Sequence, residues 1–170
     1  MKLSRNFTLE ELIQSPSAER WGIDEQFIPP QTIVNNLTLL CEKVLQPIRD
    51  LMKDSIRVTS GYRCPRLNAK IGGAYTIIDG KPRQTSQHCF GEAADIVYIK
   101  KGEKHNGSII AAIKELMKDP TFKFDQCIIE FGADTNPSWI HISYTEGRNR
   151  MQILRAYKSG KKTLYKPWTL

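Results

Sequence analysis

The chain has 170 residues, of which 40% are hydrophobic and 25% charged, and its formal net charge is +7. This length and composition are typical of one globular domain with a sizeable core. No apolar run approaches the length of a bilayer span, which excludes a membrane-spanning protein. The basic N-terminus lacks a following apolar segment, so we expect no signal peptide and synthesis in the cytoplasm.

The four cysteines are widely spaced and contain no Cys-x-x-Cys pair, which argues against a cysteine zinc site. Without a signal peptide, free thiols are expected. The excess of positive charge favours contact with polyanions. However, the basic residues are scattered except between Arg148 and Lys166, where they are typical of a solvated face, so nucleic acid is disfavoured as a partner.

The first 54 residues are predicted to be helical. Thr8 and Glu11 have the spacing of a capping box, which predicts a short helix to about Gln14. Residues 18–30 are expected to be irregular. From Thr32 to Lys53 apolar residues recur at three-four spacing, which predicts an amphipathic helix that Pro47 kinks or splits near Leu45 and Gln46.

The remaining elements are predicted to be mainly strands and turns. In chain order they are a strand at 55–60, a helical turn at 67–71, a hairpin at 74–83 with Asp79-Gly80 as its turn, a strand at 93–98, a polar loop at 100–107, a helix at 108–118 capped by Asn106 or Ser108, strands at 124–131 and 138–144, and a last strand within 148–157. We therefore expect a single domain over 1–170, with a helical part (1–54), a catalytic core (55–157) and a basic tail (158–170).

The segment from Ser86 to Asp95 carries the first candidate metal ligands. His88 and Asp95 supply an imidazole and a carboxylate, which zinc accepts. Gly91 allows a sharp turn between them. The two side chains would sit on a turn and on the strand that follows it, converging on one point.

A catalytic zinc site needs a third protein ligand. Of the other two histidines, His105 lies in the polar loop, whereas His141 lies in an alternating run where it shares one face with Trp139 and Ser143. His141 is therefore the better candidate. The alternative is that His88 is a surface turn histidine and His141 a hydrogen-bonded sheet histidine.

Three blocks of this sequence resemble a known family when taken together and in order. They are Ser60-Gly61-Tyr62-Arg63 with Asn68, then Ser86-x-His88-x-x-Gly91-x-Ala93-x-Asp95, then Trp139-x-His141-x-Ser143. This pattern is similar to that of the zinc D-alanyl-D-alanine carboxypeptidases and L-alanyl-D-glutamate endopeptidases, which include phage endolysins. The blocks span about residues 56–144.

The resemblance implies an α+β, hedgehog-like fold with a small, mainly antiparallel sheet and packed helices. It implies Zn²⁺ bound by His88, Asp95 and His141. Arg63 would hold a substrate carboxylate or stabilise an oxyanion, unless it is a plain surface arginine. At the rim, Gln84, Ser86 and Trp139 are expected to contact substrate, although Ser86 could be a simple turn serine and Trp139 a core residue.

The chain departs from the family pattern at one position. Many members carry an acidic residue three positions before the last zinc histidine, and here that position is Ser138, which cannot act as a general base. Glu130 is the best substitute if the two strands around it form a hairpin. The alternatives are a strand-end glutamate in solvent or paired with Arg63, with Asp134 as the fallback base.

The resemblance implies a zinc metallopeptidase that cleaves bonds next to D-amino acids in peptidoglycan stem peptides, as a carboxypeptidase or an endopeptidase. Its partners would be these peptides and anionic wall polymers, and release to the cell wall would follow the route of a phage or prophage endolysin. The Ser138 departure motivates the alternative of a catalytically inactive, zinc-containing wall-binding or phage structural module.

Overall fold

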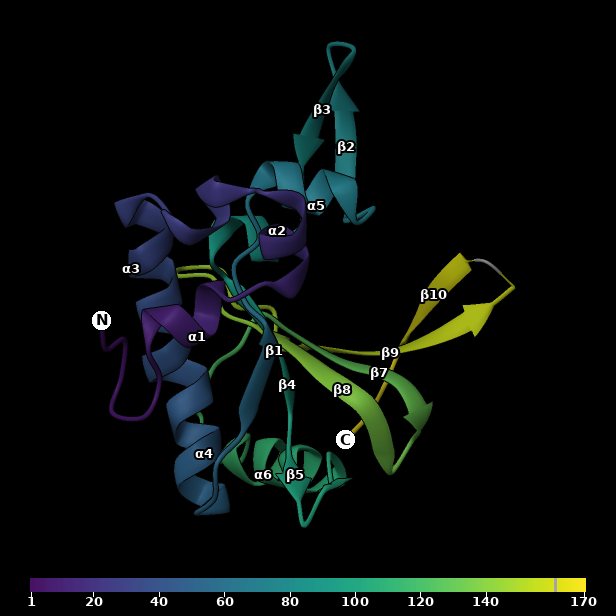
Figure 1. Cartoon of the computed structure of the whole chain (residues 1–170). Coiled ribbons are helices and arrows are strands. Elements are labelled where there is room, and N and C mark those ends of the chain that lie inside the picture. Colours follow the sequence, from purple (N-terminus) through teal and green to yellow (C-terminus); the bar gives the residue numbers. More distant parts are fainter. Residues whose placement is uncertain (161) are drawn as a thin grey trace.

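The fold is organised around a six-stranded sheet (Figure 1). The computed structural model describes residues 1–160 and 162–170. The strand order in this sheet is β1-β4-β8-β7-β9-β10, and every neighbouring pair is antiparallel except β7 and β9. The bounds of these strands are β1 (Arg57–Ser60), β4 (Ala93–Val97), β7 (Gln126–Ala133), β8 (Asn136–Ser143), β9 (Gln152–Ser159) and β10 (Lys162–Pro167). The predicted mainly antiparallel α+β fold is confirmed.

One face of the central sheet, here called the core face, is apolar. Its strands turn every second side chain toward the helices, and the inward residues are all buried: Ala94, Ile96, Cys127, Ile129, Ile140 and Ile142. They join one hydrophobic cluster with residues of α3 (Gln31–Leu40), α4 (Gln46–Met52) and α6 (Gly107–Leu116). The opposite face carries the polar side chains and is called the cleft face.

The predicted long helix is present, and proline distorts it where expected. Between α3 and α4 the chain forms a π-helical turn, η2 (Cys41–Leu45), in which the N–H of Gln46 donates to the carbonyl of Cys41. Pro47 follows directly. Because proline has no N–H and its ring crowds the carbonyl four residues earlier, a wider turn at this point accommodates it without ending the helix.

The N-terminal segment is more regular than predicted. Thr8 and Glu11 form the expected capping box of α1 (Leu9–Ile13). The segment expected to be irregular contains α2 (Pro16–Trp21) and a 3-10 helix, η1 (Asp24–Phe27). α1 ends at Ile13, close to the predicted end at Gln14. A new helix then begins, because the Ser15 hydroxyl caps α2 and Pro16 occupies its first turn, where a missing N–H costs nothing.

Two small hairpins leave the central sheet. β2 (Tyr75–Ile78) and β3 (Lys81–Gln84) form the predicted hairpin, which projects from the body in Figure 1. Its turn residues Asp79 and Gly80 both have positive φ, as the Asp-Gly sequence favours. The predicted polar loop contains β5 (Ile99–Lys100) and β6 (Glu103–Lys104). α5 (Pro65–Lys70) lies just before the first hairpin.

The start of α6 differs from the prediction, because neither proposed cap acts as one. Asn106 occupies the N-cap position but makes no side-chain cap hydrogen bond. Its buried amide instead accepts from the N–H of Tyr98, at 2.8 Å, and donates to the carbonyl of Pro137, at 2.9 Å. Asn106 therefore joins the end of β4 to the start of β8.

The C-terminal segment is also different from the prediction. The proposed boundary at residue 158 falls inside β9, and residues 162–167 of the expected tail form strand β10, paired with β9. Lys166 Nζ lies 5.6 Å from the ring centroid of Tyr157 and 5.3 Å from that of Trp168. The basic residues here are therefore part of a folded hairpin. No helix in the described chain has both the length and the apolar character that a bilayer span requires.

Candidate metal centre

The segment from Ser86 to Asp95 forms a tight turn followed by the first residues of β4. His88 lies on a 3-10 turn, η3 (Gln87–Phe90), and Gly91 ends this turn with φ +68°. A Cβ at Gly91 would lie 2.7 Å from the carbonyl oxygen of Ile33. Both the positive φ and this close approach to α3 require glycine.

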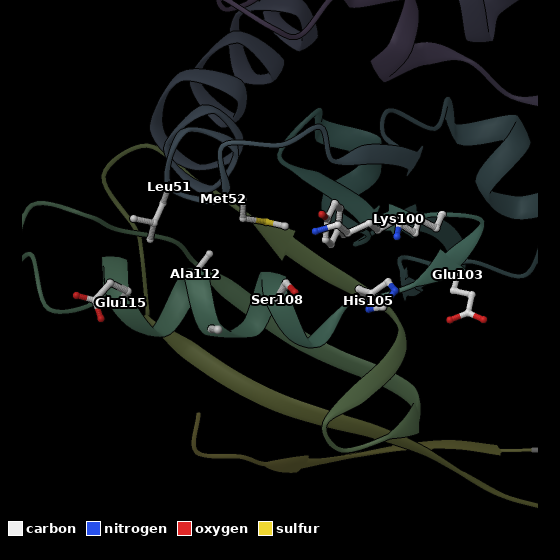
Figure 2. Close-up of a pocket in the computed structure, with 11 residues that line it drawn as sticks. Leu51, Met52, Lys100, Glu103, His105, Ser108, Ala112 and Glu115 are labelled. Atoms are coloured by element: carbon white, nitrogen blue, oxygen red, sulfur yellow. The ribbon is translucent and has the colours of Figure 1, made fainter.

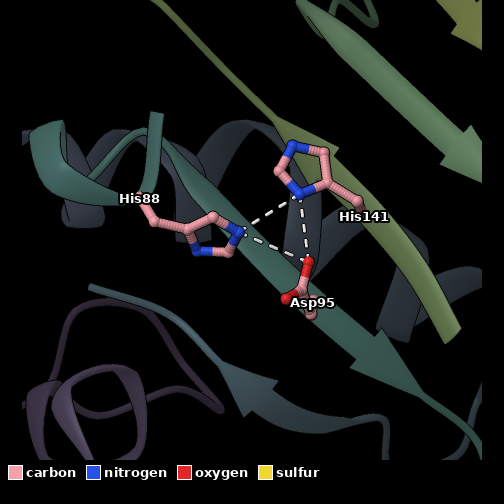
Figure 3. A group of neighbouring side chains, drawn as sticks. All are labelled: His88, Asp95 and His141. Atoms are coloured by element: carbon pink, nitrogen blue, oxygen red, sulfur yellow. Dashed lines mark hydrogen bonds and ion pairs between the residues drawn. The ribbon is translucent and has the colours of Figure 1, made fainter. Parts of the chain in front are cut away.

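Strand register brings Asp95 and His141 together. Asp95 on β4 is directly opposite His141 on β8, and both side chains lie on the cleft face. Their nearest atoms, Asp95 Oδ1 and His141 Nδ1, are 3.0 Å apart. His88 Nε2 lies 3.2 Å from His141 Nδ1 and 3.4 Å from Asp95 Oδ1, so the three side chains converge (Figure 3).

The backbone fixes which nitrogen of His88 faces this cluster. Its Nδ1 lies 2.7 Å from the carbonyl oxygen of Gly61, which only accepts hydrogen bonds, so Nδ1 carries the proton. The Nε2 lone pair then points to Asp95 and His141. A hydrogen bond of this kind behind a metal-binding histidine orients the ring and increases its basicity.

Burial and charge hold these groups in the protonation states that a metal requires. His88 is 3% exposed, and burial lowers its pKa, which favours the neutral imidazole. Burial alone would raise the pKa of Asp95, but the neighbouring His88 and His141 outweigh it and lower that pKa below its usual range. Asp95 is therefore a carboxylate at neutral pH.

These residues fit a zinc ion. A tetrahedral zinc site with bonds of about 2.0–2.1 Å separates its ligand atoms by about 3.3 Å. The three separations of 3.0, 3.2 and 3.4 Å match that edge length. Within the described residues this is the single group of three or more potential metal-ligating side chains of this kind. Three protein ligands leave a fourth position open, as in catalytic sites.

The cluster lies in a cleft of about 830 Å³ on the cleft face. The predicted residues Arg63, Ser86, Glu130 and Trp139 all line it, together with the three potential ligands. Gln84 does not line the cleft, and its amide oxygen accepts a hydrogen bond from Asn68 on α5. The expected contact between Gln84 and substrate therefore has no structural support, because β3 turns this side chain toward α5.

Glu130 is placed as the hairpin prediction required. It pairs with Trp139 across β7 and β8, two positions from the Ile128–His141 pair, and it therefore lies on the same face as His141. Burial and the charge of Asp95 raise the pKa of Glu130 to about 7. Asp134 does not line the cleft, because its carboxylate pairs with Arg155 Nε at 2.8 Å.

Ser138 does not offer an alternative base. β8 alternates regularly, so Ser138 projects to the face opposite Trp139 and His141. Its carbonyl accepts hydrogen bonds from Lys104 and Asn106. A carboxylate able to reach this cleft therefore has to come from another strand, and Glu130 on β7 meets that condition.

Arg63 joins the cleft from the loop after β1. Its backbone N–H donates to the carbonyl of His88, at 3.1 Å, which ties this loop to the turn that carries His88. Its side-chain Nε is buried and has no hydrogen-bond partner in the described chain. Burial lowers the pKa of Arg63, although Asp95 opposes that effect. Because Arg63 lines the cleft and its guanidinium is charged, this side chain is suited to an anionic group.

A polar network centred on the buried Asp125 supports the turn that carries His88, and sequence reasoning did not detect it. Asp125 is 0% exposed and accepts two hydrogen bonds from the Arg150 guanidinium, both 2.7 Å long, and one from Gln87 Nε2, at 2.8 Å. Gln87 also donates to Thr145 Oγ1. Because Gln87 precedes His88, this network connects the residue before β7 and the loop before β9 to the turn that carries His88.

The C-terminal hairpin and the loop before it supply cleft residues that were also missed. They are Arg148, Arg150, Gln152, Leu154 and Tyr165. Alternation between 152 and 156 could have indicated which side chains of β9 share a face. Nothing in the local pattern marks Tyr165, since β10 itself was not predicted.

A second cavity, of about 840 Å³, lies away from the cleft, between α4, α6 and the β5–β6 hairpin (Figure 2). Its walls combine the apolar side chains of Leu51 and Met52 with Lys100, Glu103 and His105. His105 packs near the ring of Tyr98, with the ring centroids 6.3 Å apart. His105 therefore lies away from His88 and Asp95, in agreement with the prediction that His141 is the better third ligand.

Two imidazoles and a carboxylate that converge in an open cleft are the ligand types of a catalytic zinc site. The sequence profile of the family described as Peptidase M15 matches residues 5–143. The chain therefore belongs to the M15 peptidase family, whose members are zinc-dependent peptidases. A search of curated proteins gave no significant match.

Proposed function

We propose that this protein is a zinc peptidase that cleaves bonds next to D-amino acids in peptidoglycan stem peptides. The observation that carries the proposal is the convergence of His88, Asp95 and His141 in a cleft that also contains Glu130 and Arg63. His88 Nε2, Asp95 Oδ1 and His141 Nδ1 would hold the zinc ion. When bound, zinc supplies a Lewis acid that activates water and a carbonyl oxygen at neutral pH.

Glu130 is the proposed general base. Its carboxylate accepts one proton from the attacking water as oxygen adds to the carbonyl carbon of the scissile bond. When the C–N bond breaks, the same proton passes to the departing amine, so the products are a carboxylate and an amine. The raised pKa of Glu130 suits both halves of this exchange near neutral pH.

Arg63 is the proposed anchor for a substrate carboxylate. Arg63 lines the cleft, and its backbone N–H donates to the carbonyl of His88. A guanidinium forms short, directional hydrogen bonds to a carboxylate, and stem peptides carry free carboxylates. Ser86 and Trp139 line the same cleft and are proposed substrate contacts. The net charge of +7 supports association with anionic wall polymers after release from the cell.

The test combines zinc analysis with digestion of defined muropeptides, read by mass spectrometry. Wild type should bind one zinc ion and release a product that identifies carboxypeptidase or endopeptidase activity. His88→Ala should lose the zinc. Glu130→Gln should keep the zinc but lose turnover by about 10²-fold or more. Glu103→Gln, on the distant β6, is the matched control and should behave as wild type.

Two results would overturn this proposal. Full turnover by Glu130→Gln would remove Glu130 as the base. Tight zinc binding by wild type without turnover of any muropeptide would favour a wall-binding or phage structural module instead of an enzyme.

A further inference from the structure

The C-terminal hairpin forms one wall of the cleft, and the family match does not extend to this hairpin. The match ends at residue 143, whereas β9 and β10 follow it and line the cleft with Gln152, Leu154 and Tyr165. This edge of the cleft therefore lies outside the region that the family profile describes, and its side chains can influence how this protein binds and cleaves a substrate.

Strand register places Tyr165 in the same row as Glu130. Glu130 pairs with Trp139 on one side and with Ala156 on the other, and Ala156 pairs with Tyr165. Two strand spacings, about 10 Å, separate the backbones of Glu130 and Tyr165. Ala156 is fully buried and is the residue between them in this row. Because the side chain of Ala156 is only a methyl group, it leaves room for the larger side chains of its neighbours in this row.

The hairpin holds β10 in this register. β9 and β10 pair continuously from Lys162–Ser159 to Pro167–Leu154. After β10, the N–H of Trp168 donates to the carbonyl of Ile153, at 3.0 Å. Lys166 packs over the Tyr157 ring on the other face of the hairpin. Tyr165 is therefore a side chain on a paired strand, and its direction is set by the alternation of that strand.

The Tyr165 side chain has no competing partner in the described chain. Its residue is 54% exposed, it lines the cleft, and its hydroxyl makes no hydrogen bond to the described residues. Burial, with the charges of Glu130 and Asp95, raises the pKa of Tyr165. The phenol thus keeps its proton at neutral pH and is a donor.

We propose that the Tyr165 hydroxyl donates a hydrogen bond to the carbonyl oxygen of the scissile bond as that oxygen gains negative charge. The proposal rests on the proposed peptidase function. Arg63 follows β1 and Tyr165 lies on β10, the two opposite edges of the central sheet, with Glu130 on a strand between them. A substrate in the cleft would therefore contact Arg63 at one end and Tyr165 at the other.

A phenol suits this position better than a cation. A lysine or arginine beside Glu130 would form an ion pair with it and weaken it as a base. A neutral hydroxyl leaves the Glu130 charge intact and strengthens its own hydrogen bond only when charge develops on the substrate oxygen. Such a donor stabilises the transition state more than the bound substrate, so its removal should lower kcat and leave KM nearly unchanged.

The test compares Tyr165→Phe with Tyr157→Phe, both as zinc-loaded full-length protein. Tyr157 lies on β9 of the same hairpin, outside the cleft lining, so its variant controls for loss of a phenol from the hairpin. We expect Tyr165→Phe to lower kcat by about 10²-fold, with KM within about 3-fold, and Tyr157→Phe to match wild type. A phosphinate analogue of the cleaved peptide, which mimics the tetrahedral state, should bind Tyr165→Phe more weakly by a similar factor.

Each other outcome overturns the inference. Unchanged kcat in Tyr165→Phe would exclude the proposed bond. A rise in KM alone would make Tyr165 a packing contact, and a shift of only the acidic limb of the pH profile would make it a partner of Glu130. These results leave the peptidase proposal intact, whereas a wild type without turnover of stem peptides would remove both.

Discussion

Substitution of the buried Asp125 is the strongest test of how the turn that carries His88 is supported. Asp125→Asn keeps the shape of the side chain but removes its charge. One of its two oxygens becomes an NH₂ group, which would face the donors of Arg150 or Gln87. At least one charge-assisted hydrogen bond is lost and one buried donor is left without an acceptor.

The expected loss of stability follows from the exposure of the two partners. Breaking a fully buried ion pair from one side costs about 3–5 kcal/mol. Here Asp125 is 0% exposed but the Arg150 side chain is 48% exposed and can turn to water. We therefore expect a lower value, about 2–3 kcal/mol, since exposed partners contribute less. For a chain of this length, that change lowers Tm by roughly 4–12 °C.

The pH dependence identifies the cause of this loss. Burial would raise the pKa of Asp125, but its hydrogen bonds from Arg150 and Gln87 lower it below the ordinary value. A depressed pKa in the folded state contributes stability that is present above the unfolded pKa, about 3.9, and is lost as the pH falls through the folded pKa. The Tm difference between wild type and Asp125→Asn should be constant above pH 5 and shrink below pH 4.

The assay is thermal unfolding of chelator-treated protein from pH 3 to 8, followed by circular dichroism. Asp79→Asn, in the exposed turn of the β2–β3 hairpin, is the control and should change stability by less than about 0.5 kcal/mol. A Tm difference that does not depend on pH, or one no larger than that of the control, would refute the role of the Asp125 charge.

Three further predictions concern other parts of the site. Gly91→Ala should destabilise the protein by more than about 2 kcal/mol, because the residue has positive φ and a Cβ there would clash with Ile33. Gly80 also has positive φ but has open space around it, so Gly80→Ala should lower the free energy of unfolding by less in the same denaturant titration. Arg155→Met should lower the free energy of unfolding by about 3 kcal/mol, because Arg155 donates to the carbonyls of Ile129, Ala156 and Gly132. Equal stability of this variant and wild type would show that these three hydrogen bonds do not stabilise the fold. In zinc-free protein the pKa of Glu130 is about 7, which is above its unfolded value of about 4.3. Wild type should therefore lose stability relative to Glu130→Gln as the pH rises from 4 to 7, and should lose no more above pH 7. Tm measured against pH for both proteins tests this.

Local physical chemistry explains why several features were predictable from sequence. The Thr8–Glu11 box, the Asp79-Gly80 turn and the distortion before Pro47 each depend on residues within one or two turns of the backbone. The alternation of Trp139 and His141 likewise predicted which side chains of β8 share a face. These preferences act over a few residues and need no knowledge of the fold.

Other features depended on pairings between distant segments. The pairing of β4 with β8 brings Asp95 opposite His141, and the carbonyl of Gly61 selects the tautomer of His88. The exclusion of Gln84 from the cleft depends on its hydrogen bond to Asn68.

The sequence by itself determined the candidate ligands and their order along the chain, and its resemblance to a known family implied the mainly antiparallel α+β class. The turns and the alternation of the strands were readable because they depend on local residues. Only the tertiary structure decided that β10 pairs with β9 and that Tyr165 shares a row with Glu130. The physical reason is that register across a sheet is set by hydrogen bonds and packing summed over several strands, which no window of the sequence contains.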